Sequence, residues 1–169
     1  MKNNIKHELQ LILQGKSPVS HGTVIQTIAS YLRRSAQAGA VAQTDEYFKK
    51  EEAKELVEYI ELNNLWIQDI RFDLYLSEGA EQRVYIKDHK YVYKLNDSIY
   101  YATWLDYLCN LLLNNYFFPD TAYRLEGFYR SENNTMYALV EQAYVKATQP
   151  TDLEKVKLFL KSNGFKNNR

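Results

Sequence analysis

One stretch of the chain combines a glycine, an apolar residue and a lysine at spacings that suit a phosphate site. Gly79 lies in the polar break Ser77–Ala80, and Lys94 follows ten residues after Val84. Glycine lets the backbone bend tightly, so that amide groups can approach phosphate oxygens. A lysine on a nearby strand reaches the same oxygens as a point charge, and Val84 would cover a base. The pattern favours a nucleotide site, although a hairpin glycine followed by a strand lysine also occurs in many ordinary sheets.

The elements that must position these residues follow from hydrophobic periodicity. Apolar residues alternate strictly from Ile70 to Leu76, which is typical of a half-buried strand. Aromatic and β-branched residues then flank the short polar turn Asp88–Lys90, which predicts an antiparallel hairpin. We expect five strands, at about residues 70–76, 83–87, 91–95, 123–129 and 136–145. Helical spacing predicts a long amphipathic helix over residues 98–115 and a shorter one over 151–162.

The first part of the chain has only helical periodicity. Three helices are expected there, near residues 5–13, 21–37 and 45–60. We therefore predict an α+β protein with two parts, a helical segment at 1–69 and an antiparallel sheet domain at 70–169. The sheet domain would have one helix inserted after its third strand and another at its end.

This order of elements, with Gly79-Ala80-Glu81 followed by Val84-Tyr85, resembles the N-terminal lobe of protein kinases. It is most similar to the kinase-like domain of bacterial and phage polyvalent proteins, and the likeness covers residues 70–165. The resemblance implies that Gly79 and Glu81 lie in the phosphate-binding loop and that Val84 covers adenine. It further implies that Lys94 contacts the α- and β-phosphates of Mg-ATP.

The same resemblance implies a hinge at residues 141–144. There the backbone of Glu141 and Ala143 would meet the adenine ring. Kinases also place a glutamate on the helix after the third strand, where it pairs with the strand lysine. Residues 98–115 contain no glutamate and Asp106 is their only interior acid, so a Lys94–Asp106 pair is a hypothesis.

The departures from the kinase pattern bear on catalysis. Gly79 is the only one left of the three glycines in the usual loop. No segment like His-Arg-Asp or Asp-Phe-Gly occurs in the 169 residues, so we expect no phosphoryl transfer by this chain alone. The chain would then be cut short, one half of a split kinase, or a relic that only binds.

A rival hypothesis is a non-catalytic interaction module. Residues 1–69 would present a surface to another protein, and the lobe would dock on a partner that supplies the missing C-terminal lobe. An uncovered lobe exposes an apolar patch, and such patches favour homodimers.

Composition excludes several other classes. The 21 basic and 21 acidic residues give no net charge, whereas a DNA-binding protein usually has a basic excess, so we expect no nucleic-acid partner. No stretch approaches the ~20 apolar residues that span a membrane. The three histidines are scattered, which argues against a metal site. The single Cys109 and the lack of a signal peptide predict a cytoplasmic protein.

Overall fold

A computed structural model describes residues 5–38, 45–146 and 148–166 of the chain. Within these residues three helices precede the sheet, namely α1 (Ile5–Leu13), α2 (Gly22–Ala38) and α3 (Asp45–Leu62). Two more helices follow later, α4 (Trp104–Phe117) and α5 (Leu153–Ser162). None of the described helices is both long enough and apolar enough to cross a membrane.

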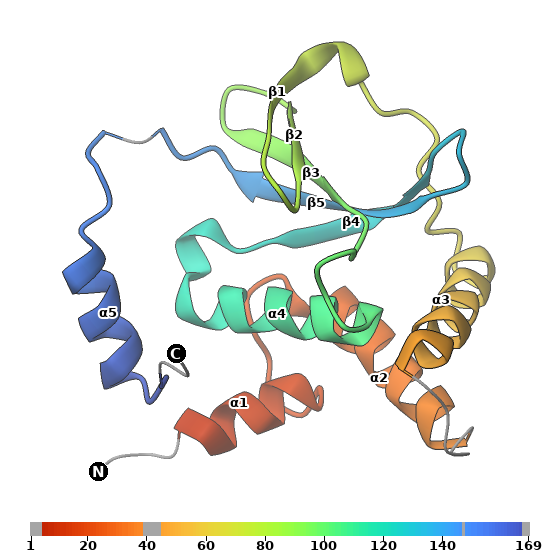
Figure 1. Ribbon diagram of the computed structural model, residues 1–169, viewed down its shortest axis with the longest axis horizontal. Coiled ribbons are helices and arrows are strands. Elements are labelled where there is room, and N and C mark those ends of the chain that lie inside the picture. Colours follow the sequence, from red (N-terminus) through yellow and green to blue (C-terminus); the bar gives the residue numbers. More distant parts are fainter. Residues whose placement is uncertain (1–4, 39–44, 147, 167–169) are drawn as a thin grey trace.

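One antiparallel sheet of five strands forms the upper layer in Figure 1. Its strands are β1 (Tyr75–Glu78), β2 (Arg83–Ile86), β3 (Tyr91–Asn96), β4 (Arg124–Arg130) and β5 (Met136–Ala143). They lie side by side in the order β1-β2-β3-β5-β4, and α4 connects β3 to β4. The predicted α+β fold is confirmed, with the inserted helix after the third strand.

The first strand is shorter than the alternating pattern predicted, and this prediction was wrong in its bounds. Residues Phe72–Leu74 form a 3-10 turn, η1, and the paired strand begins only at Tyr75. Ile70 and Phe72 pack over the sheet ahead of this strand instead of pairing within it, whereas Leu76 lies in β1. The Phe72 ring packs edge-on against Tyr85 and Tyr129, at centroid distances of 5.5 and 5.3 Å.

The start of α4 also differs from the prediction. The helix begins at Trp104 rather than near Ser98, because Ser98 adopts a φ of +61° that no helix contains. Thr103 is the N-cap, and its hydroxyl accepts a hydrogen bond from the Asp106 amide at 3.0 Å. Similarly, Asp152 rather than Thr151 caps α5.

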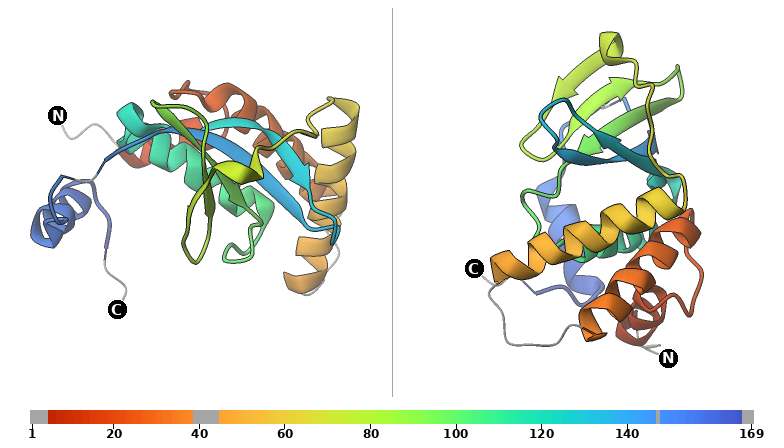
Figure 2. Two further views of the ribbon diagram at one scale, coloured as in Figure 1. Left: turned by 90° about the horizontal axis from the view of Figure 1, so that it is seen from above. Right: turned by 90° about the vertical axis from the view of Figure 1, so that its right-hand side faces the viewer.

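A single hydrophobic core joins the N-terminal helices to the sheet. In Figures 1 and 2, α4 lies under the sheet with α2 against it and α3 across one end. The shared core cluster includes Ile12, Ile28, Leu56, Leu108, Leu112, Phe128 and Val140. Complete burial of one such side chain contributes about 1.5–3 kcal/mol to folding. The boundary between residues 69 and 70 stays a prediction, but the residues on its two sides bury each other.

Gly127 is where the segment after α3 joins the sheet. The Phe128 amide donates to the Leu65 carbonyl at 2.9 Å, and the Ile67 amide donates to the Phe128 carbonyl at 2.7 Å. A Cβ at position 127 would lie 2.5 Å from the Leu65 carbonyl oxygen. The register between β4 and β5 shifts at the same point. A glycine here lets two backbones touch, and this contact ties the helical part to the outer edge of the sheet.

Candidate functional site

Lys94 lies at the centre of the sheet face that is turned toward α4. On its two sides the register places Val84 of β2 and Val140 of β5 directly opposite it. Side chains opposite each other in neighbouring strands share a face. Val84, Lys94 and Val140 therefore form one row, with a cation between two apolar residues.

The ring of Tyr123 lies next to the Lys94 ammonium group. The Lys94 Nζ lies 5.3 Å from the centre of the Tyr123 ring, and no ion pair joins Lys94 to a carboxylate among the residues that the structure describes. Tyr123 is itself fixed by α4. The Asn115 amide group donates to the Tyr123 carbonyl at 2.8 Å and accepts from the Tyr123 amide at 2.7 Å. The position of Lys94 thus depends on the end of α4.

The loop between β1 and β2 carries Gly79 and Glu81. The Gly79 amide donates to the Gln82 carbonyl at 2.9 Å, and a Cβ on Gly79 would meet nothing within 4 Å. The loop therefore leaves open space at the glycine. Glu81 contacts the connection between β3 and α4, because its carboxylate accepts a hydrogen bond from the Tyr101 hydroxyl at 3.1 Å.

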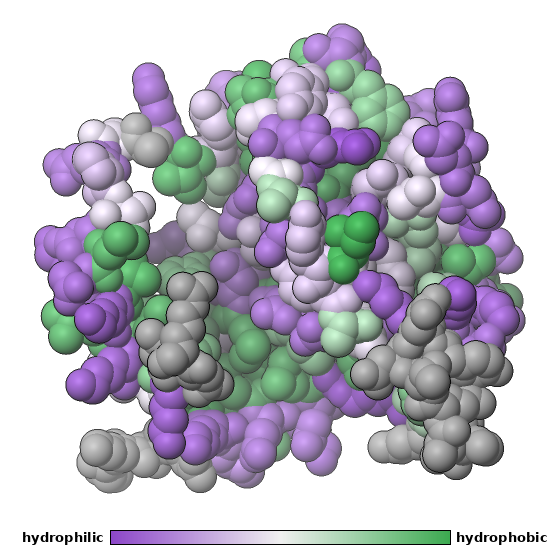
Figure 3. All heavy atoms as spheres, viewed as in Figure 1, coloured by the Kyte–Doolittle hydropathy of each residue, from purple (hydrophilic) through white to green (hydrophobic). Residues whose placement is uncertain are grey.

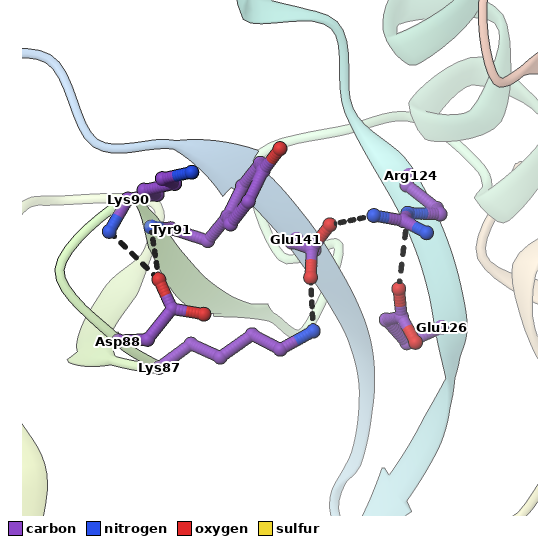
Figure 4. Close-up of polar contacts among 7 residues, drawn as sticks. All are labelled: Lys87, Asp88, Lys90, Tyr91, Arg124, Glu126 and Glu141. Carbon is purple, nitrogen blue, oxygen red and sulfur yellow. Dashed lines mark hydrogen bonds and ion pairs between the residues drawn. The ribbon is translucent and has the colours of Figure 1, made fainter.

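The opposite face of the sheet holds a buried carboxylate. Glu141 is 2% exposed and accepts from both Lys87 and Arg124, and Arg124 also lies 3.3 Å from Glu126 (Figure 4). The Lys87 ammonium stands 5.0 Å from the Tyr93 ring centre on the same face. Its hydrogen bond to Glu141 raises the pKa of Lys87 to about 12. The same carboxylate raises the pKa of Arg124.

A comparison with known protein families identifies the family of this chain. Residues 49–169 match the family described as "Serine/Threonine/Tyrosine Kinase found in polyvalent proteins". The chain belongs to this kinase family. Neither a curated protein nor a solved structure matches it. The match begins within α3, so it covers part of the helical segment as well as the sheet.

The sequence-predicted residues of the kinase site divide between the two faces. Val84 and Lys94 share a face, and Gly79 and Glu81 lie in the adjoining β1–β2 loop. The Glu141 side chain lies on the other face, in the ion cluster. Its backbone is enclosed as well, because β5 pairs at this residue with Tyr93 on one side and Arg124 on the other.

Ala143 differs from Glu141 in having an open edge. Pairing with β4 stops at Glu141, whereas pairing with β3 continues to Ala143 opposite Tyr91. The Tyr144 amide donates to the Lys90 carbonyl on the β3 side at 2.7 Å. Backbone groups alternate along a strand, so the amide and carbonyl of Ala143 point to the uncovered side. Of the two predicted hinge residues, only Ala143 has backbone groups available to a ligand.

Asp106 is not joined to Lys94 in this structure. Its carboxylate lies in the first turn of α4, where it accepts from the Ala102 amide at 3.4 Å and the Asn110 side chain at 3.3 Å. Its side chain is exposed. These contacts give Asp106 a role in starting the helix.

Two buried polar side-chain atoms, one on β3 and one just before β2, have no hydrogen-bond partner. Asn96 lies two residues along β3 on the same face, is 2% exposed, and uses its oxygen to accept from the Ser98 amide at 2.7 Å. Its Nδ2 is unpaired, as is the Oε1 of Gln82, which immediately precedes β2. Unpaired buried polar atoms are costly. The unpaired Asn96 donor and a lysine without a carboxylate suit the acceptor oxygens of a polyphosphate, whereas the Gln82 oxygen, itself an acceptor, does not.

Sequence reasoning missed the residues that support Lys94. Tyr123 and Asn115 contact each other and the lysine region, and Tyr101 reaches Glu81. The chain has 15 tyrosines, and no local pattern distinguishes Tyr101 and Tyr123 from the others. Asn115 carried a weak signal, since an asparagine near the end of a strongly apolar helix is a buried polar residue that needs partners.

Proposed function

We propose that this chain binds Mg-ATP on the Lys94 face of its sheet, as the nucleotide-binding N-terminal lobe of a protein kinase. Gly79 and the amides beside it would hold phosphate, with Glu81 in the same loop, and Lys94 would contact the phosphate oxygens. Val84 would cover the adenine ring. The backbone of Ala143 would meet the edge of that ring, in place of Glu141.

The placement of Lys94 carries this proposal. A lysine in the middle of a sheet normally has an acidic partner, since an unpaired half-buried charge is costly. Lys94 instead stands between Val84 and Val140 with the Tyr123 ring near its ammonium, and it has no acidic partner among the residues that the structure describes. An anionic ligand on this face would supply the missing negative charge.

A thermal-shift titration with Mg-ATP tests the proposal. Mg-ATP at 100 times its Kd would stabilise the native protein by about 2.7 kcal/mol. Lys94→Met should remove this stabilisation and leave the unliganded protein folded. Lys90→Met is a matched control, because Lys90 carries the same charge in the exposed turn before β3. An equal response of both variants to Mg-ATP would refute the assignment of Lys94.

No segment like the His-Arg-Asp or Asp-Phe-Gly motifs of kinases occurs in the 169 residues. The catalytic aspartate and the metal-binding asparagine and aspartate belong to a C-terminal lobe. Bound Mg-ATP would supply the phosphoryl group and the metal, while the residues of this chain hold and orient it. We therefore propose that these residues bind nucleotide without transferring phosphate, and an assay with a generic acceptor protein checks this.

The exposed apolar surface of α5 supports a second candidate, a protein-interaction role. The helix touches the rest of the described structure through the rings of Phe117 and Phe118, and many of its apolar side chains reach the surface (Figure 3). The exposed residues are Leu153, Val156, Leu158, Phe159 and Leu160. Another polypeptide, or a second copy of this chain, would cover them.

Sedimentation velocity separates the two candidates. Concentration-dependent association that Leu158→Ser abolishes, and that neither Mg-ATP nor Lys94→Met affects, would favour the interaction role. A monomer at all concentrations together with Lys94-dependent ATP stabilisation would favour the nucleotide role. Association and ATP binding that are both absent would contradict both.

A further inference from the structure

Helix α3 reaches the connection between β3 and α4 with two charged side chains. The Lys49 ammonium donates to the carbonyls of Ser98 and Tyr101, each at 2.8 Å. Glu52, one turn further along α3, accepts from the amides of Trp104 and Leu105 at 2.6 and 3.3 Å. The right-hand view of Figure 2 shows α3 crossing α4 at this point.

These contacts satisfy groups that would otherwise lack partners. The first amides of a helix have no partner within the helix, and Glu52 supplies one from another element. The carboxylate also lies at the positive end of the α4 dipole. The Ser98 backbone needs support for a different reason. Ser98 is fully buried with a φ of +61°, a conformation that costs energy for a residue other than glycine.

Tyr101 extends these contacts from α3 to the β1–β2 loop beside the Lys94 face of the sheet. Lys49 holds its carbonyl, and its ring packs edge-on against Tyr107 of α4 with the centroids 5.2 Å apart. Its hydroxyl then donates to Glu81 in the β1–β2 loop at 3.1 Å. One residue therefore connects α3 to the loop that carries Gly79.

We propose that α3 positions the β1–β2 loop, with Lys49 fixing the β3–α4 connection so that the Tyr101 hydroxyl can hold Glu81. Lys49 and Tyr101 are positioning residues in this scheme. The effect on nucleotide affinity rests on the proposed Mg-ATP site, but the effect on the loop itself does not. The helical segment becomes a built-in part of the lobe instead of a separate recognition module.

Hydrogen–deuterium exchange of the loop amides in the unliganded protein gives the direct test. The readout is the exchange rate at residues 79–83. Tyr101→Phe removes one hydroxyl and should raise the rate by about three- to tenfold, the range for loss of one hydrogen bond. Tyr100→Phe is the matched control, since Tyr100 is the neighbouring tyrosine and is 64% exposed. It should leave the loop unchanged.

The role of Lys49 is tested in the same way. Lys49→Met should raise loop exchange as Tyr101→Phe does, and the double variant should add little to either. Lys49→Arg keeps a cationic donor and should restore most of the protection, which a purely space-filling role would not predict. Lys6→Met, at an exposed position on α1, controls for loss of one charge.

The possible results separate this proposal from the nucleotide proposal. Unchanged loop exchange in both Tyr101→Phe and Lys49→Met would overturn the positioning role, whatever ATP does. Raised loop exchange in both variants, with Tyr100→Phe unchanged, would support the positioning role even if neither the original protein nor any variant binds Mg-ATP. If Mg-ATP does bind, its Kd should rise by about three- to tenfold in the same two variants.

Discussion

The lysines on the two faces of the sheet differ in whether they have an acidic partner. Lys87 donates to Glu141, a carboxylate that is 2% exposed and also binds Arg124. Lys94, one strand away on the other face, has the Tyr123 ring as its neighbour. A lysine with a buried acidic partner contributes to stability, and its charge is already paired. A lysine that contacts a ring instead of a carboxylate can still form an ion pair with an anionic ligand.

The largest expected effect concerns the acid of the paired face. Glu141→Ala leaves two cations without their shared partner. We expect the free energy of unfolding to fall by about 2–3 kcal/mol, less than the ~3–5 kcal/mol of a fully buried pair because both cations keep solvent contact. Urea denaturation measures it. Glu126→Ala, which removes only the exposed partner of Arg124, should cost under ~0.5 kcal/mol. Equal losses in the two variants would break the contrast between the faces.

Replacing each lysine by methionine tests the difference between the two faces. Lys94→Met should change the free energy of unfolding by less than about 1 kcal/mol, because the described part of the chain gives Lys94 no ion pair to lose. It should abolish Mg-ATP stabilisation, which is worth about 2.7 kcal/mol at 100 times the Kd. Lys87→Met should do the reverse, with lower stability and an unchanged response to Mg-ATP. A variant that loses both properties would show that the faces are not independent.

The pH dependence of Lys87 gives a smaller effect with a defined sign. The pKa of Lys87 rises from 10.5 to about 12 on folding. Its stabilising contribution is therefore complete below pH 10.5 and is lost as the pH rises through about 12. The difference in unfolding free energy between the original protein and Lys87→Met should be constant from pH 7 to 9 and smaller at pH 11. A difference that grows above pH 10 would contradict the pairing.

The smallest effect is expected at Glu52, a carboxylate that accepts its hydrogen bonds from the backbone amides of Trp104 and Leu105. Burial raises its pKa, so its contribution to stability is present below pH 4.5 and is lost as the pH rises through the folded-state pKa. Glu52→Gln keeps an oxygen acceptor without the charge. At pH 7 it should change the free energy of unfolding by no more than ~0.5 kcal/mol, and Glu52→Ala should cost about 1–2 kcal/mol. Denaturation at pH 4 and 7 should show the glutamine variant gaining relative to the original as the pH rises.

Several elements could be predicted from the sequence because their signals are local. The hairpin at Asp88–Lys90 and the apolar stripe of α4 depend on residues within a few positions of one another. The row from Val84 to Lys94 followed in the same way, since a short turn fixes the register of a hairpin. The strand expected at Ile70–Leu76 failed for an equally physical reason. An alternating apolar stretch can pack over a sheet instead of pairing within it, as Phe72 does.

The hinge shows where local reasoning stopped. Glu141 and Ala143 are two residues apart and look equivalent in the sequence. Their difference depends on where β4 begins, because only Glu141 lies between two paired strands. The Glu141 side chain finds its cations on β4 and at the end of β2, at separations of 17 and 54 residues.

The sequence by itself determined the elements, their order and the kinase resemblance, because hydrophobic period, turn residues and motif spacing act over short distances. Only the tertiary structure decided which lysine is paired, which hinge residue is open, and that α3 contacts the β3–α4 connection. Those outcomes depend on contacts such as Lys49 with Tyr101, 52 residues apart. No local pattern encodes a contact of that kind, since it forms only when the shared core brings the helices onto the sheet.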